Sequence, residues 1–395
     1  MQFFFPNTVA DAPDEVRIFM DARGDLYPDD GIAAGYALPD GSHGSLFEAA
    51  RGGDPALCLE PRAGSELEEL CDAVDEGCYG SVTTDCFARW QMVQETMWKR
   101  RAERIAARFG EDGRDTIGVL IYGFNNWFRE SDANYATAER EMRRFLPADR
   151  KIGFVEVYWD GCRGNDKGIG CWSRAQSTGP LAGFALRRLF NGVEEAWTTA
   201  SGSPSWRVLT HSSGAFVAGA TFGDPTIALP QLQDPTTNRW YGRFARHRDE
   251  DRGPDRIPQL SDARLGMFAP ATPSSTFGGQ SRGVLSQNLT ILTVVQPDDS
   301  ALNKLVLGCR RLGASCLGAI ETQACDLKRE LEGRGTGITL SVYDFGRPED
   351  PWGDERELHD YSVYVRQAAD HSTFFRDFLG SDPRATDASP LIDCG

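Results

Sequence analysis

The run Trp206-Arg207-Val208-Leu209-Thr210-His211-Ser212-Ser213-Gly214-Ala215 decides which fold we expect. It begins as an apolar strand, turns through small and polar residues, and continues into a small-residue segment, 216–220, that predicts a helix. A strand, a sharp turn that holds a serine, and a helix together form the arrangement called a nucleophile elbow. Gly214 and its small neighbours allow the helix to pack close to the turn. We therefore predict that Ser212 is a catalytic nucleophile and that most of the chain serves to position it.

Apolar runs and helical segments alternate along the rest of the chain. Continuous apolar runs are typical of strands that are buried on both faces of a parallel sheet. The predicted strands cover residues 15–20, 116–122, 152–159, 206–209, 265–270, 289–295 and 338–343. The predicted helices cover residues 87–109, 134–145, 181–198 and 372–379, and a further helix starts at Ala301. The alternation predicts an α/β fold with a mostly parallel central sheet flanked by helices.

The length of 395 residues suits one large α/β domain with insertions or two ordinary domains. We divide the chain into an N-terminal extension with its leading helix, residues 1–110, packed on the core, and a catalytic domain, residues 111–395. Residues 51–86 show little periodicity, so we expect them outside the sheet. Two surface insertions interrupt the alternation at residues 225–262 and 309–335. The first insertion is either a lid near the site or a passive loop.

Charge and hydropathy exclude several classes of function. The net charge of −16 argues against a nucleic-acid partner, because a phosphate backbone attracts a basic surface. No apolar run reaches the roughly 18 residues of a transmembrane helix. Residues 1–6 are apolar, but they are short and lack the basic leader of a secretory signal. We therefore expect a cytoplasmic protein, or one exported by a route that uses no signal peptide.

The ten cysteines do not predict a metal site, because none forms a Cys-x-x-Cys pair or a Cys/His group with zinc-finger spacing. Two clusters, residues 58–86 and 309–325, are compatible with local disulfides. They are equally compatible with reduced thiols that pack as small hydrophobic side chains. The missing signal peptide favours the reduced state.

A serine hydroxyl needs a histidine as base, and that histidine needs a carboxylate to fix its tautomer. On an α/β sheet of the hydrolase type these residues follow in the order serine, acid, histidine. Asp298 and Asp299 come directly after the predicted strand at 289–295. A carboxylate at this position either caps the next helix or acts in catalysis. The order favours Asp299 as the catalytic acid, with Asp298 in reserve.

The chain offers five candidates for the histidine base: His43, His211, His247, His359 and His371. The base must follow the last strand, which leaves His359 and His371. His371 precedes a predicted helix, whereas His359 lies in a charged stretch that is typical of a surface. We therefore predict His371 as the base and expect His211 to pack beside the site.

An oxyanion hole requires two backbone N–H donors. The residue after the nucleophile, Ser213, supplies one of them. The loop after the strand at 116–122 suits the second, because Gly123 lets the backbone turn close to the substrate and directs the N–H of Phe124 inward. A plain turn at the end of a strand is the alternative interpretation of Gly123.

Taken in order, these motifs resemble the α/β-hydrolase superfamily of serine hydrolases, in particular the bacterial alpha/beta hydrolase family of unknown function 900. The resemblance covers residues 115–380. It rests on Tyr122-Gly123-Phe124-Asn125-Asn126, Tyr158-Trp159-Asp160-Gly161, His211-Ser212-Ser213-Gly214, Ala269-Pro270-Ala271, Asp299-Ser300-Ala301-Leu302 and His371-Ser372-Thr373-Phe374-Phe375. The sequence departs from the family pattern at Thr210, Tyr122 and Ala271, where the family has Gly, His and Asp.

The resemblance implies an enzyme of the esterase or lipase type that forms an acyl-enzyme and needs neither a metal nor an organic cofactor. Ser212 would attack a small-molecule or lipid ester, His371 would take its proton, and Asp299 would orient His371. The N–H groups of Phe124 and Ser213 would hold the oxyanion. The alternatives are a peptidase or thioesterase with the same triad, an exported lipolytic effector, and a non-catalytic binding protein with this fold.

Overall fold

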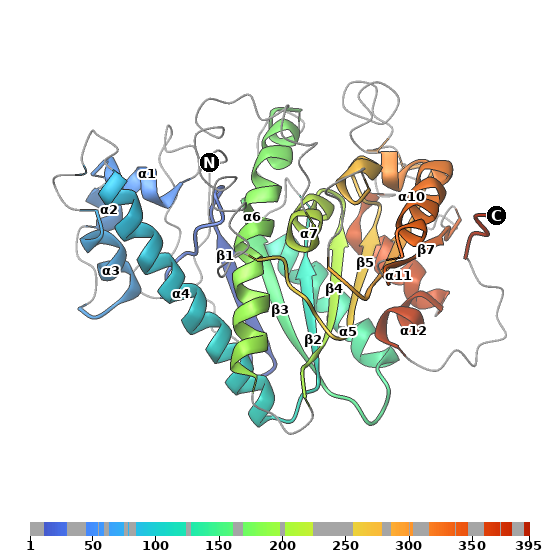
Figure 1. Ribbon diagram of the computed structural model, residues 1–395, viewed down its shortest axis with the longest axis horizontal. Coiled ribbons are helices and arrows are strands. Elements are labelled where there is room, and N and C mark those ends of the chain that lie inside the picture. Colours follow the sequence, from blue (N-terminus) through green and yellow to red (C-terminus); the bar gives the residue numbers. More distant parts are fainter. Residues whose placement is uncertain are drawn as a thin grey trace.

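The structure is a computed structural model in which the polypeptide forms a layered α/β arrangement (Figure 1). It describes residues 12–29, 45–53, 55–58, 63–74, 78, 84–123, 128–160, 169–197, 202–223, 256–278, 286–299, 301–302, 316–335, 337–346, 359–371, 373–380 and 391–395. These ranges contain the predicted strands and most of the predicted helices.

A parallel sheet with the strand order β1-β3-β2-β4-β5-β6-β7 forms the centre of the described structure. All of its strand pairs are parallel. The strands are β1 (Glu15–Met20), β2 (Thr116–Ile121), β3 (Ile152–Trp159), β4 (Ser205–His211), β5 (Ala263–Phe268), β6 (Leu289–Val294) and β7 (Thr339–Tyr343). Every residue of β2 and β3 is buried, as expected for strands covered on both faces. The prediction of an α/β fold with a parallel sheet is therefore confirmed.

Helices cover both faces of the sheet (Figure 1). One group packs together in front of it: α4 (Thr84–Glu111), α6 (Ile169–Ala196) and α7 (Gly214–Phe222). The second group packs together on the other face: α5 (Phe128–Phe145), α11 (Tyr361–Asp370) and α12 (Thr373–Leu379). The helix α10 (Glu321–Gly333) lies beside the edge strand β7.

Helices α6 and α11 differ most from the sequence-based expectation. α6 begins at Ile169, so that Pro180 lies inside a helix that we expected to start after it. α11 was not predicted, although it has the buried spacing Tyr361, Tyr364, Val365 and Ala368 of an amphipathic helix. The helix predicted from Ala301 lies largely outside the described residues, which show a turn at 301–302.

The N-terminal region is partly integrated into the sheet. β1 pairs with β3 in parallel and forms one edge, so a piece of the predicted extension 1–110 belongs to the core. The short helices α1 (Leu46–Arg51), α2 (Pro55–Cys58) and α3 (Glu66–Asp72) lie beside α4, away from the sheet, as expected for residues 51–86 (Figure 1).

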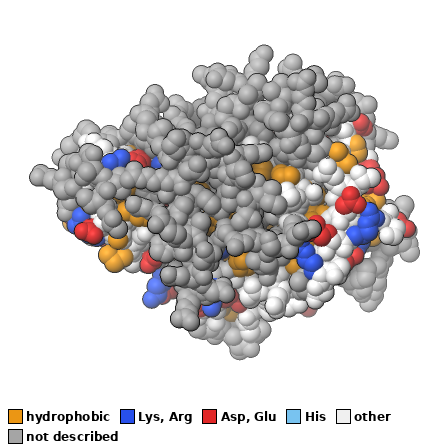
Figure 2. All heavy atoms as spheres, turned by 45° about the horizontal axis from the view of Figure 1, so that its top comes forward, with side chains coloured by type: hydrophobic (Ala, Val, Ile, Leu, Met, Phe, Trp, Pro, Cys, Tyr) orange, Lys and Arg blue, Asp and Glu red, His pale blue; other side chains and the backbone are white. Residues whose placement is uncertain are grey.

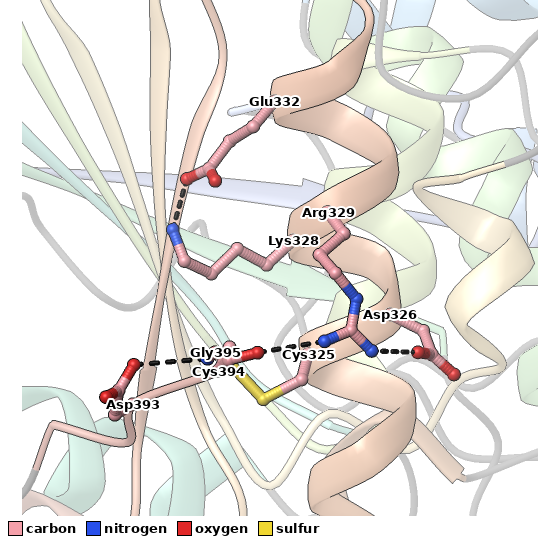
Figure 3. The surroundings of a disulfide bond; sticks show 8 residues. All are labelled: Cys325, Asp326, Lys328, Arg329, Glu332, Asp393, Cys394 and Gly395. Carbon is pink, nitrogen blue, oxygen red and sulfur yellow. Dashed lines mark hydrogen bonds and ion pairs between the residues drawn. A yellow bond between two sulfur atoms is a disulfide. The ribbon is translucent and has the colours of Figure 1, made fainter.

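Among the described residues, six cysteines form three disulfides. Cys58–Cys71 and Cys78–Cys86 are local pairs within the first cluster. Cys325–Cys394 instead joins α10 to the C-terminus across 69 residues of sequence (Figure 3). The interpretation as reduced thiols is therefore wrong for these six residues.

The third disulfide anchors a tail that covers part of an edge strand. Leu391 forms an antiparallel bridge with Tyr343 of β7, and the N–H of Ile392 donates to the carbonyl of Val342. Arg329 donates to the carbonyl of Cys394 next to the disulfide (Figure 3). Covering an exposed strand edge in this way limits pairing with another chain.

The two predicted insertions are described only in part. Residues 224–255 lie outside the described structure, so the interpretation of 225–262 as a lid or a passive loop is not addressed. Residues 256–262 lead into β5 and are held from both sides, by Asn191 donating to the carbonyl of Arg256 and by Ser286 donating to that of Pro258. Within 309–335 the described part consists of a short 3₁₀ turn, Cys316–Gly318, and α10.

Acidic and basic side chains lie next to one another on the described parts of the surface (Figure 2). Along α10, for example, Arg329 pairs with Asp326 and Arg334 pairs with Glu330. Exposed pairs of this kind contribute little to stability. Among the described helices, none combines the length and the hydropathy that crossing a membrane requires.

Candidate active site

Ser212 lies on a strained turn at the carboxyl end of β4, immediately before α7. Its φ of 53° is in the left-handed region, which residues with a side chain rarely adopt. The N–H of Ser212 donates to the carbonyl of Phe268 at 3.0 Å, and the carbonyl of Ser212 accepts from Ala271 at 3.0 Å and from Ala215 at 3.2 Å. Hydrogen bonds from β5, the segment that follows it and α7 therefore hold the serine in this conformation.

Two glycines allow the serine turn to lie against the end of β2. A Cβ atom on Gly214 would lie 2.8 Å from the carbonyl oxygen of Ile121, and one on Gly123 would lie 2.9 Å from the Cβ of Ser212. A side chain at either position would push the turn away from the sheet. Thr210 is buried, and within the described residues its hydroxyl lacks a hydrogen-bond partner.

Asp299 is fully buried and follows β6. Its Oδ1 accepts from the N–H groups of Ala301 at 2.8 Å and Leu302 at 3.1 Å. Its Oδ2 lies 2.6 Å from Nδ1 of His359 and accepts from the hydroxyl of Tyr364 at 2.8 Å. The carboxylate therefore caps the following turn with one oxygen and faces a histidine with the other.

The environment of Asp299 keeps it ionised. Burial by itself raises the pKa of a carboxyl group, but the charge of His359 and the hydrogen bonds from His359, Tyr364 and Leu302 lower the pKa of Asp299 to about 2. Asp298, the reserve candidate, has an exposed side chain. The structure thus brings Asp299, and not Asp298, to the histidine.

His359 lies between Ser212 and Asp299, where we had placed His371. Its Nε2 is 2.9 Å from Oγ of Ser212, and its Nδ1 is 2.6 Å from Asp299. His371 instead follows α11, stacks on Phe345 and lies 3.2 Å from the carbonyl oxygen of Phe345 through its Nε2. The prediction of His371 is therefore corrected to His359. A helix of ten residues, about 15 Å long, separates the two histidines, so only one of them reaches the serine.

The sequence contains a signal, which we missed, for the helix that begins directly after His359. His359 directly precedes Asp360, the N-cap residue of α11, whose carboxylate accepts from the N–H of Ser362 at 2.7 Å. An Asp before an amphipathic pattern marks the start of a helix. The charged neighbours that suggested a surface position therefore include the cap that holds His359 in place.

His211, which we expected beside the site, packs against His359. The two ring centroids are 4.8 Å apart, and the ring of His211 also contacts Tyr122, Tyr361 and Tyr364. Burial, reinforced by the charge of His359, holds the pKa of His211 well below its usual value. Within the described residues neither ring nitrogen has a hydrogen-bond partner. His211 therefore packs beside His359 as a neutral aromatic ring.

The predicted oxyanion donors are described only in part. Ser213 is buried and precedes the first residue of α7, so its backbone lies directly beside the serine turn. Phe124 lies outside the described residues. The neighbouring end of β2 is well anchored, because the N–H of Tyr122 donates to the hydroxyl of Tyr135 at 2.9 Å and its carbonyl accepts from Trp159 at 2.8 Å.

One group of carboxylates among the described residues has a geometry compatible with a metal ion. Oxygen atoms of Glu15, Glu139 and Glu156 lie within 4.8 Å of one another. Arg17 already pairs with Glu156 at 2.8 Å, and Arg143 pairs with Glu139 at 3.3 Å. These guanidinium groups supply the countercharge that a metal ion would otherwise provide.

Comparisons with known proteins add little to this geometry. A scan against protein-family models and a search of curated proteins found no match. A search of solved structures found weak similarity to an uncharacterized protein from Pseudomonas aeruginosa, at 9% sequence identity and a TM-score of 0.23. The aligned region covers 75% of this chain and 50% of that one, so this chain spans about half of its length.

Proposed function

We propose that this protein is a serine hydrolase of the α/β-hydrolase type that cleaves carboxylic esters. The observation that carries the proposal is the connected line from Ser212 Oγ through His359 to Asp299, with separations of 2.9 and 2.6 Å. Three further features support it: the positive φ of Ser212, the chain order serine, acid, histidine, and the location of each residue after a parallel strand.

In the proposed mechanism, His359 accepts the proton of Ser212 at Nε2 while the oxygen attacks the ester carbonyl. Asp299 accepts from Nδ1–H of His359, which fixes the tautomer and stabilises the imidazolium that forms. The backbone N–H groups of Ser213 and Phe124 are the proposed donors to the oxyanion. His359 then donates its proton to the leaving alcohol, and water releases the acyl group by the same steps in reverse.

The three disulfides in the described part of the chain support a compartment more oxidising than the cytoplasm. Disulfides persist in secreted and periplasmic proteins and are rare where thiols are kept reduced. Cys58–Cys71 and Cys78–Cys86 close short loops near the N-terminus, and Cys325–Cys394 anchors the C-terminus. We therefore propose that the protein acts outside the cytoplasm.

The test is covalent labelling with a fluorophosphonate together with hydrolysis of p-nitrophenyl acetate. We expect one adduct per chain, on the peptide that contains Ser212, and complete loss of labelling and hydrolysis in Ser212→Ala. Ser274→Ala, a change in a 3₁₀ turn after β5, is the control and should label like wild type. Folded wild-type protein that neither labels nor hydrolyses the ester would point to a binding protein. A series of esters, thioesters and peptides then separates the esterase from a thioesterase or a peptidase.

A further inference from the structure

Tyr364 contacts the carboxylate of Asp299, although a triad of serine, histidine and acid does not require it. Its hydroxyl donates to Asp299 Oδ2 at 2.8 Å, and the same oxygen lies 2.6 Å from His359. The side chain is fully buried and its ring stacks on Phe268 of β5. The hydroxyl is therefore held in place by packing and has a single acceptor among the described residues.

The start of α11 explains why His359 and Tyr364 meet the same oxygen. Asp360 is the N-cap, so His359 occupies the position before the cap and Tyr364 the fourth position of the helix. Residues at these two positions pack against each other at many helix starts. Here both side chains carry a donor, and both donors face Asp299.

We propose that Tyr364 is a positioning residue of this site: its hydroxyl holds the Asp299 carboxylate and takes up part of its charge, and it thereby tunes the basicity of His359. The kinetic consequence rests on the proposed function, whereas the effect on the imidazole does not. A carboxylate oxygen that loses one donor interacts more strongly with the remaining one. Without the hydroxyl, the imidazolium form of His359 becomes more stable.

The groups around His359 indicate that Tyr364 is the hydrogen-bond donor to Asp299 whose removal changes the basicity of His359. Among the residues that the structure describes, the titratable groups near His359 are Asp299 after β6, His211 at the end of β4, and Asp360 and Tyr364 of the α11 segment. Tyr122 and Tyr361 pack on His211. His211 is neutral because burial lowers its pKa. Burial and the charge of Asp299 raise the pKa of Tyr364 well above its usual value, so it remains a donor at working pH.

The test compares Tyr364→Phe with Tyr361→Phe. Both residues are fully buried tyrosines at the start of α11, but the hydroxyl of Tyr361 has no hydrogen-bond partner among the described residues. The pKa of His359 is measured by NMR titration of its imidazole resonances, assigned with His359→Gln among the five histidines of the chain. We expect an upward shift of about half a unit to one unit in Tyr364→Phe and no shift in Tyr361→Phe.

The rate of fluorophosphonate labelling as a function of pH provides the second measurement. We expect Tyr364→Phe to label about 5- to 10-fold more slowly at its plateau, because the Asp299 carboxylate that orients His359 is no longer held by the hydroxyl. The midpoint of the profile should move upward with the imidazole pKa. An unchanged His359 pKa in folded Tyr364→Phe, or an equal shift in Tyr361→Phe, would overturn the proposal. If wild type does not label but the imidazole shift is present, the proposed function fails and the role of Tyr364 toward His359 stands.

Discussion

A histidine lies next to each end of helix α11, and the surroundings of these two histidines differ. His359 at the N-terminal end lies between a serine hydroxyl and a buried carboxylate. His371 at the C-terminal end stacks on a phenylalanine and lies near a backbone carbonyl. The same residue type beside the same helix can thus face a strained serine or an ordinary packing neighbour. What distinguishes the two is which end of the helix returns to the carboxyl edge of the sheet.

Replacing each of the two histidines by alanine in turn tests this comparison and has the largest expected effect. We expect His359→Ala to lower fluorophosphonate labelling of Ser212 by about 10⁵-fold, because a serine without its base is a poor nucleophile. His371→Ala should label within about threefold of wild type, since His371 lies at the far end of α11. The labelling rates of both variants show which histidine Ser212 needs, and circular dichroism checks that both variants are folded. A large loss in His371→Ala with retained fold would reverse our correction.

The adjacent aspartates Asp298 and Asp299 give the next largest expected difference in labelling rate. Asp299→Asn should reduce labelling by about 10⁴-fold, because an amide in place of the carboxylate favours the wrong tautomer of His359. Asp298→Asn should have little effect, since this side chain is exposed. The same labelling assay at neutral pH measures both variants. Equal effects at the two positions would show that Asp299 acts only as a cap for the following turn.

The aspartates at the two ends of α11, the N-cap Asp360 and the last helical residue Asp370, give the smallest expected difference and test how the helix is held. Asp360→Ala removes the N-cap bond to Ser362 and should lower the free energy of unfolding by about 1 kcal/mol. Asp370→Ala removes an exposed negative charge from the last turn of α11. The change should raise the free energy of unfolding by about 0.3 kcal/mol, because that end of the helix dipole is negative. Urea denaturation measures both changes. A stability loss in Asp370→Ala would contradict this account of how α11 is held.

Much of the fold was accessible from local patterns. The continuous apolar runs identified the strands, including β1, because a strand buried on both faces leaves a simple signature. The turn at Ser212 and the acid position at Asp299 could be located for the same reason, since each follows such a run. The histidine that contacts Ser212 could not be identified, because His359 and His371 both lie next to helices and local sequence does not say which one approaches β4.

The cysteine pairs show a similar limit of what the sequence alone predicts. The pairs Cys58–Cys71 and Cys78–Cys86 join neighbours within a cluster that the spacing identified. Cys325–Cys394 joins residues far apart in the sequence, which only the packing of the C-terminal tail against α10 and β7 brings together.

The sequence by itself determined the alternation of strands and helices, the serine turn with its small neighbours, and an acid placed after a later strand. These features depend on residues close together in the chain, where periodicity, glycine and capping act directly. The tertiary structure alone decided which histidine lies against Ser212, that Tyr364 reaches the same carboxylate, and that β1 closes one edge of the sheet. Each of these depends on how a distant segment packs, and that packing is set by the burial of whole helix faces against the sheet.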